Sequence, residues 1–159
     1  MSNRRFERAA LDLAAKGYYV FPCRPRGKVP LTPNGFKDAT RDQRQILHWW
    51  DRWPDANIAI ACGASGIVVV DIDPKHGADP REVIPELGLE NHPVVWTGEA
   101  PEPSDRYPNS LVGVRGAHLY FGGHLPSCDT EIPGVEIKGD GTYVLAPPSV
   151  HETGVPYEE

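Results

Sequence analysis

The pattern of apolar and polar positions along the chain predicts two helices near its N-terminus. Apolar residues recur at helical spacing in residues 3–16, and the same spacing returns in residues 40–53. The second segment begins with Thr40, followed three residues later by Gln43, which is the spacing of a capping box. We therefore expect one helix in each segment.

Most of the later apolar runs are short and bounded by glycine or proline, as β-strands are. The expected strands cover residues 18–23, 56–62, 66–73, 93–98 and 117–123, with two more on either side of residues 139–141. The Gly-Asp-Gly at 139–141 predicts a hairpin. A short helix is expected at residues 78–89, with Asp79 as its cap and Pro80 at its first position. The whole pattern indicates one mixed α/β domain of the α+β class, spanning residues 1–159.

Three of the expected strands carry ionisable side chains on one face and aliphatic side chains on the other, because strand residues alternate between faces. The ionisable ones are Asp71, Asp73, His118, Glu136 and Lys138. Each has an ordinary explanation, namely a turn cap, a structural histidine and an exposed Glu-Lys pair. Asp71 and Asp73, however, are only two residues apart on one face. Two carboxylates this close repel each other unless a cation or hydrogen-bond donors compensate their charge.

If the three strands are neighbours in one sheet, this face combines three carboxylates with a histidine and a lysine. Three carboxylates can hold two hard divalent cations through oxygen. The imidazole and the ammonium group beside them can receive a triphosphate. Such a set suits two-metal nucleotidyl transfer, and it suits hydrolysis of a phosphodiester equally well.

Charge is distributed unevenly along the chain, whose formal net charge is −6. Residues 1–52 hold 11 Lys/Arg and 5 Asp/Glu, a net of +6, and residues 53–159 a net of −12. This asymmetry indicates a polyanion-binding face beside a metal-binding face, or simply uneven surface charge. No apolar run is long enough to span a membrane, and the N-terminal segment lacks the apolar stretch of a signal peptide. Three dispersed cysteines without CxxC spacing fit a reducing, cytoplasmic location and no zinc site.

The order of these motifs resembles the prim-pol domain, the N-terminal domain of bifunctional DNA primase/polymerases of phages and plasmids, in the archaeo-eukaryotic primase superfamily. The resemblance covers almost the whole chain. It rests on the segments KGYYVFPCRPRGKVPL, GFKDATRDQRQILHWWDRWPDANIAIACG, GIVVVDIDPKHG, AHLYF and GVEIKGDGTYVLAPPSVH. The resemblance implies a small mixed sheet with flanking helices, RRM-like at its centre.

The resemblance also implies roles for particular residues. Asp71, Asp73 and Glu136 match metal-binding carboxylates for Mg²⁺ or Mn²⁺, and His118 matches a histidine that contacts the phosphates of the incoming nucleotide. Lys138 and Lys28 are expected to contribute phosphate or template contacts. Arg115 stands where the chain departs from the family pattern, and there it either adds a phosphate contact or marks a different turn. The implied partners are a single-stranded DNA template and dNTPs or NTPs, with a helicase domain or protein in cis or in trans.

The chain departs from the family pattern at several points. Glu136 stands where the family commonly has Asp, and Arg115-Gly116-Ala117-His118 stands where it usually has Gly-Gly-x-His. The chain ends soon after the expected hairpin, so we expect either an N-terminal fragment of a longer primase-helicase or a minimal domain. Two other functions stay open, a metal-dependent nuclease and a non-catalytic nucleic-acid or nucleotide-binding module.

Overall fold

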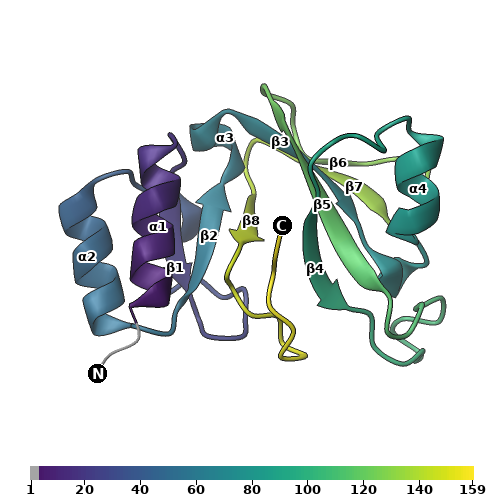
Figure 1. Cartoon of the computed structure of the whole chain (residues 1–159), viewed down its shortest axis with the longest axis horizontal. Coiled ribbons are helices and arrows are strands. Elements are labelled where there is room, and N and C mark those ends of the chain that lie inside the picture. Colours follow the sequence, from purple (N-terminus) through teal and green to yellow (C-terminus); the bar gives the residue numbers. More distant parts are fainter. Residues whose placement is uncertain (1–3) are drawn as a thin grey trace.

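A computed structural model describes residues 4–159, whose strands form two antiparallel sheets (Figure 1). The three-stranded sheet has the order β1-β2-β8 and consists of β1 (Val20–Cys23), β2 (Asn57–Ala61) and β8 (Tyr143–Ala146). The five-stranded sheet has the order β4-β5-β3-β7-β6 and consists of β4 (Val95–Glu99), β5 (Arg115–Gly122), β3 (Ile67–Ile72), β7 (Val135–Lys138) and β6 (Cys128–Asp129). The expected α+β class is confirmed. The strands of the domain divide between two sheets.

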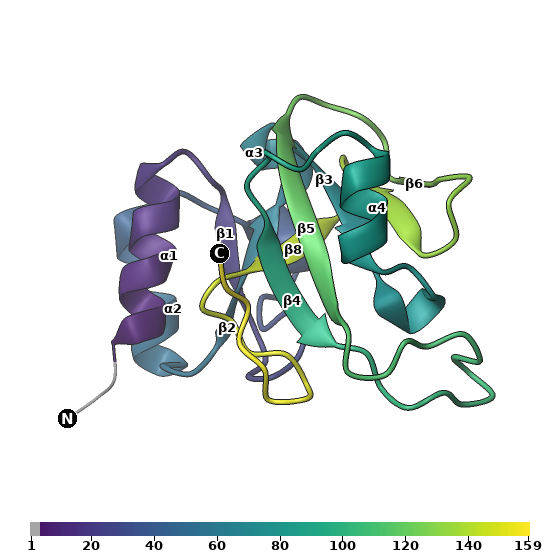
Figure 2. The same cartoon turned by 45° about the vertical axis from the view of Figure 1, so that its right-hand side comes forward.

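Helices cover the outer sides of this pair of sheets (Figures 1 and 2). The helices α1 (Arg5–Ala15) and α2 (Gln43–Arg52) pack on the three-stranded sheet, and α4 (Pro80–Glu86) packs on the five-stranded sheet. The short α3 (Cys62–Ser65) joins β2 to β3, and the 3₁₀ turns are η1 (Gly35–Asp38) and η2 (Pro74–His76). Within residues 4–159, no helix has the length and apolar character needed to cross a membrane.

The helix starts agree with the sequence-based expectation in one case and differ in another. Asp79 caps α4 by accepting a hydrogen bond from the backbone N–H of Arg81, with Pro80 at the first helical position. The cap of α2 is Asp42, whose side chain accepts from the N–H of Arg44, so the expected capping box at Thr40 is wrong. Thr40 is held instead by backbone hydrogen bonds to Val20 in β1, which place it before the helix.

The expected hairpin around Gly139-Asp140-Gly141 is also wrong, because its two strands belong to different sheets. The strand β7 pairs with β3 and β6, whereas β8 pairs with β2. The connection lies against residues 125–126, where the N–H of Asp140 donates to Leu125 O over 2.8 Å. A Cβ on Gly139 would lie 2.0 Å from that same carbonyl oxygen, so only glycine permits this approach. The glycines thus serve a crossing between the sheets.

Each face of the five-stranded sheet packs against a different layer. Val69 faces the three-stranded sheet and joins the larger core with α1 and α2. Ile72, Leu119 and Val135 face the other way and pack beneath α4. The expected alternation is therefore present, and the polar positions of β3, β5 and β7 fall on the face between the two sheets.

Two of the three cysteines are buried in this fold, so we expect a thiol reagent to label the third selectively. Burial raises the pKa of the Cys23 thiol to about 12 and that of Cys62 to about 11, while Cys128 is exposed. Because the thiolate is the reactive form, we expect one thiol per native chain to react promptly with dithionitrobenzoate. All three should react in guanidinium chloride. The Cys128→Ser variant should show no prompt reaction, and prompt labelling of that variant would contradict the packing described.

Candidate active site

Three strands place a histidine, an aspartate and a glutamate in one row across the five-stranded sheet, with the aspartate in the middle. The central strand β3 has Asp71 directly opposite His118 of β5 on one side and Glu136 of β7 on the other. Directly opposed residues of antiparallel strands share a face and have close Cβ atoms. The three expected strands are therefore neighbours, and their polar residues form a row on the face toward the three-stranded sheet.

A cavity of about 230 Å³ opens beside this row, between the two sheets. Asp71, His118 and Lys138 line it from the five-stranded sheet, and Lys28 lines it from the loop after β1. The Lys28 loop is held in place because the hydroxyl of Tyr143 donates to Lys28 O over 2.8 Å. The rest of the wall is strand β8 with Thr142, and Tyr157. Two lysines and one carboxylate thus meet in one polar cavity.

A smaller cavity of about 50 Å³ shares Lys28, Asp71, His118 and Tyr157 with the first, and it also includes Asp73. Both aspartates of the Asp-x-Asp motif therefore line one cavity, as their shared face predicts. Its walls also contain three residues for which the sequence suggested no function, Lys75, His151 and Tyr157.

The environment keeps Asp71 ionised although its side chain is mostly buried. Burial alone raises the pKa of Asp71, but the neighbouring His118, followed by Lys138 and Lys28, holds it below its usual value. His118 Nε2 lies 3.2 Å from Asp71 Oδ1. Burial lowers the pKa of Lys138, but Glu136 and then Asp71 outweigh this and hold it above its usual value. The cavity is therefore lined by charged groups of both signs.

Asp71, Asp73 and Glu136 are called the site carboxylates below. Asp73 and Glu136, like Asp71, have cationic partners. Glu136 Oε2 lies 3.0 Å from Lys138 Nζ, and Asp73 Oδ2 lies 3.7 Å from Lys75 Nζ. Asp73 in addition caps η2 by accepting from the N–H of Lys75 over 2.9 Å. The ordinary explanation of an aspartate here, a turn cap, thus applies to Asp73 but not to Asp71.

The site carboxylates fit a hard divalent cation by their chemistry and by their strand positions. Carboxylate oxygens are preferred ligands of Mg²⁺ and Mn²⁺, and Glu136 faces Asp71 across the sheet. In the present side-chain arrangement, no three His, Cys, Asp or Glu residues within 4–159 are grouped closely enough to hold a metal ion. The three site carboxylates therefore do not converge in this arrangement, and a site with three protein ligands would need Glu136 to turn away from Lys138.

Arg115, expected to contact a nucleotide, lies elsewhere and holds the C-terminal segment. Its guanidinium donates to the carbonyl oxygens of Thr97 and Pro156 and pairs with the carboxylate of Glu158. Residue 158 in turn makes two backbone hydrogen bonds with Trp96 at the edge strand β4. These contacts give Arg115 a structural task outside both polar cavities.

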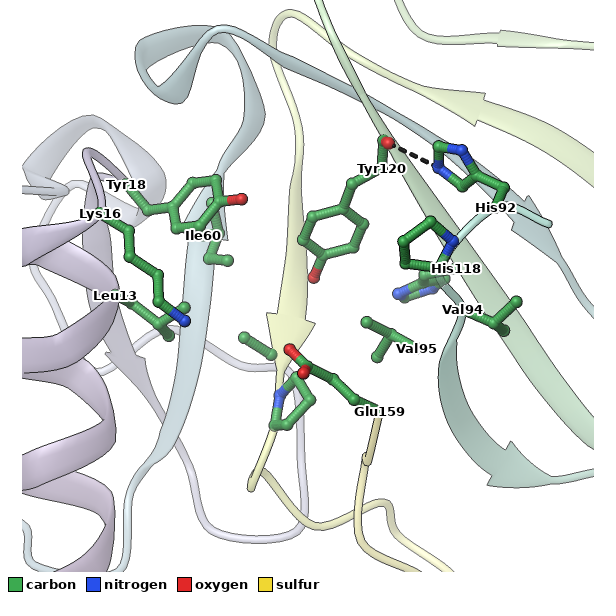
Figure 3. A pocket seen from close by; sticks show the side chains of 13 residues that line it. Leu13, Lys16, Tyr18, Ile60, His92, Val94, Val95, His118, Tyr120 and Glu159 are labelled. Atoms are coloured by element: carbon green, nitrogen blue, oxygen red, sulfur yellow. Dashed lines mark hydrogen bonds between the residues drawn. The ribbon is translucent and has the colours of Figure 1, made fainter.

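A third cavity, of about 330 Å³, lies on the other side of His118 (Figure 3). The side chain of Tyr120 points into it across from Tyr18, while the backbone oxygen of Tyr120 lies 2.9 Å from His92 Nε2. Its other walls are largely apolar and come from α1, β2, β4 and the end of β8. It has none of the site carboxylates, although Lys16 and Glu159 bring one charge of each sign to its wall (Figure 3).

The sequence alone did not indicate Lys75, Tyr157 or His151 as site residues. Lys75 directly follows the Asp-x-Asp-Pro stretch, and its ammonium lies 4.9 Å from the ring centre of Tyr107. Tyr157 is buried, and its ring centre lies 6.1 Å from that of His118 and 6.4 Å from that of His151. The only signal for Lys75 is its position beside Asp73, and Tyr157 and His151 depend on a long-range packing that no local pattern reveals.

Comparison with known proteins identifies the family. The family model described as bifunctional DNA primase/polymerase, N-terminal, matches residues 10–159, which is nearly the whole chain. A search of curated proteins found no match. The family match agrees with the helices and two antiparallel sheets of the structure. The chain belongs to the Prim-Pol family and is a DNA primase/polymerase-type domain.

Proposed function

We propose that this domain adds nucleotides to a 3′-hydroxyl on a single-stranded DNA template, with Mg²⁺ or Mn²⁺ held by the site carboxylates. The observation that carries the proposal is the row in which Asp71 lies between His118 and Glu136, beside a cavity that two lysines also line. Acidic groups for cations next to basic groups for phosphates are the combination that nucleotidyl transfer needs.

The residues of the site would divide the work by charge. When bound by the carboxylates, the cations supply positive charge that activates the 3′-hydroxyl and stabilises the charge developing on the phosphate. Lys28, from the loop after β1, and Lys138, from β7, offer ammonium groups to the triphosphate. His118, beside Asp71, adds a further contact to a phosphate oxygen. Positioning and charge stabilisation then supply most of the rate enhancement.

The template is proposed to follow the basic loop after β1. Arg24, Arg26 and Lys28 are exposed on this loop, and Lys28 reaches the cavity itself. Basic side chains bind a nucleic-acid backbone largely by neutralising phosphates, so affinity should fall as salt rises. An affinity for single-stranded DNA that does not change with salt would exclude this loop as the binding surface.

The experiment is a gel assay on a single-stranded DNA template, with and without an annealed primer, with labelled dNTPs or NTPs and either Mn²⁺ or Mg²⁺. Metal-dependent lengthening of the primer, or new labelled product without it, supports the proposal. Shortening of the DNA alone would indicate a metal-dependent nuclease, and binding without either reaction a non-catalytic module. Chelation by EDTA should abolish the reaction.

A further inference from the structure

The segment that follows β8 is fixed to the rest of the fold by side chains that bond to its backbone. In Figures 1 and 2 it passes between the two sheets on its way to the C-terminus. Asn57 of β2 accepts from the N–H of Val150 over 2.8 Å and donates to Val150 O over 2.8 Å. The Ser149 hydroxyl accepts from the N–H of Ile58 over 2.8 Å and donates to Ile58 O over 3.2 Å. This segment is therefore held firmly just before His151.

The turn at His151 is fixed from a second direction by the basic loop. Arg26 donates from its guanidinium to Glu152 O over 3.0 Å. The imidazole ring of His151 lies directly against the backbone of strand β4, where a Cβ on Gly98 would be 2.0 Å from His151 Cγ. Glycine at position 98 thus provides the space that the ring occupies.

The hydrogen bonds of His151 determine which ring nitrogen carries the proton. The backbone N–H of Thr153 donates to His151 Nδ1 over 3.2 Å, and Thr153 Oγ1 lies 2.9 Å from the same nitrogen. A nitrogen that accepts an N–H bears no proton, so the proton of the neutral ring is on Nε2. Burial, followed by the charge of Lys28, lowers the pKa of His151, while Glu152 and Asp73 raise it less. The ring is therefore neutral near pH 7 and has an N–H to donate.

The surroundings of His151 indicate what this N–H meets. His151 lines the smaller cavity together with Asp71, Asp73, Lys28 and Lys75. None of the hydrogen bonds found among residues 4–159 uses its Nε2. The cavity thus contains the ammonium groups of Lys28 and Lys75 and the neutral N–H of His151. These three donors match the oxygens of a phosphate group.

We propose that His151 is a substrate-binding residue that donates a hydrogen bond from Nε2 to a phosphate oxygen held beside Lys28 and Lys75. This inference rests on the proposed function, because it assumes that a nucleotide or a DNA strand enters the cavity. The phosphate belongs either to the incoming nucleotide or to the DNA backbone. A role as general base does not fit, because the unprotonated nitrogen of the neutral ring, Nδ1, is occupied by Thr153.

The test measures binding, so it does not depend on turnover. Affinity is measured by fluorescence anisotropy for a labelled α,β-imido dNTP with Mn²⁺ and, separately, for a labelled primer–template. His151→Ala and His151→Phe should each weaken one of these affinities roughly tenfold or more, the effect of losing a hydrogen bond to a charged group. His151→Gln should keep much of the affinity, because its amide can donate in place of Nε2. His48→Ala, on the exposed face of α2, is the matched control.

The two probes identify the source of the phosphate. Weakening confined to the nucleotide assigns it to the triphosphate, and weakening confined to the primer–template assigns it to the DNA backbone. If wild type binds and every His151 variant binds both probes within twofold of it, the inference is overturned while the proposed function stands. If wild type binds neither probe, the proposed function fails as well. His151→Phe retains a ring against Gly98, so a similar melting temperature excludes a general loss of folding.

A second variant tests the position of the ring independently. Gly98→Ala should displace the imidazole and weaken binding of the same probe, whereas it should have no further effect in a His151→Ala background. Gly122→Ala is the matched control, because that strand glycine has open space around its Cβ position. If Gly98→Ala weakened binding of the probe equally in the wild-type and His151→Ala backgrounds, displacement of the imidazole ring would not be the cause of the weaker binding.

Discussion

Replacing Asp71 by Asn is expected to lower the rate of nucleotide addition by at least about a thousandfold, or about 4 kcal/mol of transition-state stabilisation. Asn has nearly the shape of Asp but lacks its negative charge, so a cation at this position loses a ligand. Asp71 is central because its strand lies between the strands of His118 and Glu136. Primer extension with equal amounts of the two proteins measures the effect.

The control for Asp71→Asn is Asp55→Asn, which changes an exposed aspartate before β2. The control should extend primers at the wild-type rate. Both variants should give the wild-type far-ultraviolet circular dichroism spectrum, because the aliphatic side chains of β3 remain in place. Asp71→Asn extending primers as fast as wild type would remove Asp71 from the catalytic machinery.

Replacing Asn57 by Ala is expected to lower the free energy of unfolding by about 3 kcal/mol, a large part of the total of a typical domain. Asn57 is fully buried and makes three hydrogen bonds through its side chain, two with Val150 and one to Gly27 O. Each of these backbone groups loses its partner in the variant, and buried unpaired groups are costly. Urea unfolding followed by tryptophan fluorescence measures the change.

The matched control for this variant is Asn91→Ala, since Asn91 is exposed. It should change the free energy of unfolding by less than about 0.5 kcal/mol. Asn57 also links the basic loop to the segment that contains His151, so Asn57→Ala should weaken substrate binding along with stability. A free energy of unfolding within 0.5 kcal/mol of wild type for Asn57→Ala would mean that these bonds do not anchor the segment.

The sequence predicted which site residues share a face within each strand, because that depends on a local rule. Side chains alternate along a strand, so Asp71 and Asp73 share a face whatever the rest of the fold does. The same rule applies to Glu136 and Lys138. That β3 lies between β5 and β7 is not a local property, so the sequence alone does not predict it.

The features that the sequence did not predict all depend on contacts between distant residues. The Gly-Asp-Gly turn has the composition of a hairpin, but pairing with residues 125–126 directs β8 into the other sheet. The position of His151 depends on Asn57, which bonds to Val150 and is 93 residues before it in the chain. Arg115 looks like a phosphate ligand by type, yet its partners are in the C-terminal segment.

The most direct test of the central claim is a calorimetric titration of Mn²⁺ into the wild-type protein and into Asp71→Asn and Glu136→Gln. We expect wild type to bind Mn²⁺ and each variant to bind it at least about tenfold more weakly, a loss of about 1.4 kcal/mol. The exposed Glu131→Gln is the control and should bind as wild type does. Equal affinity in wild type, Asp71→Asn and Glu136→Gln would contradict the claim that these carboxylates hold the metal.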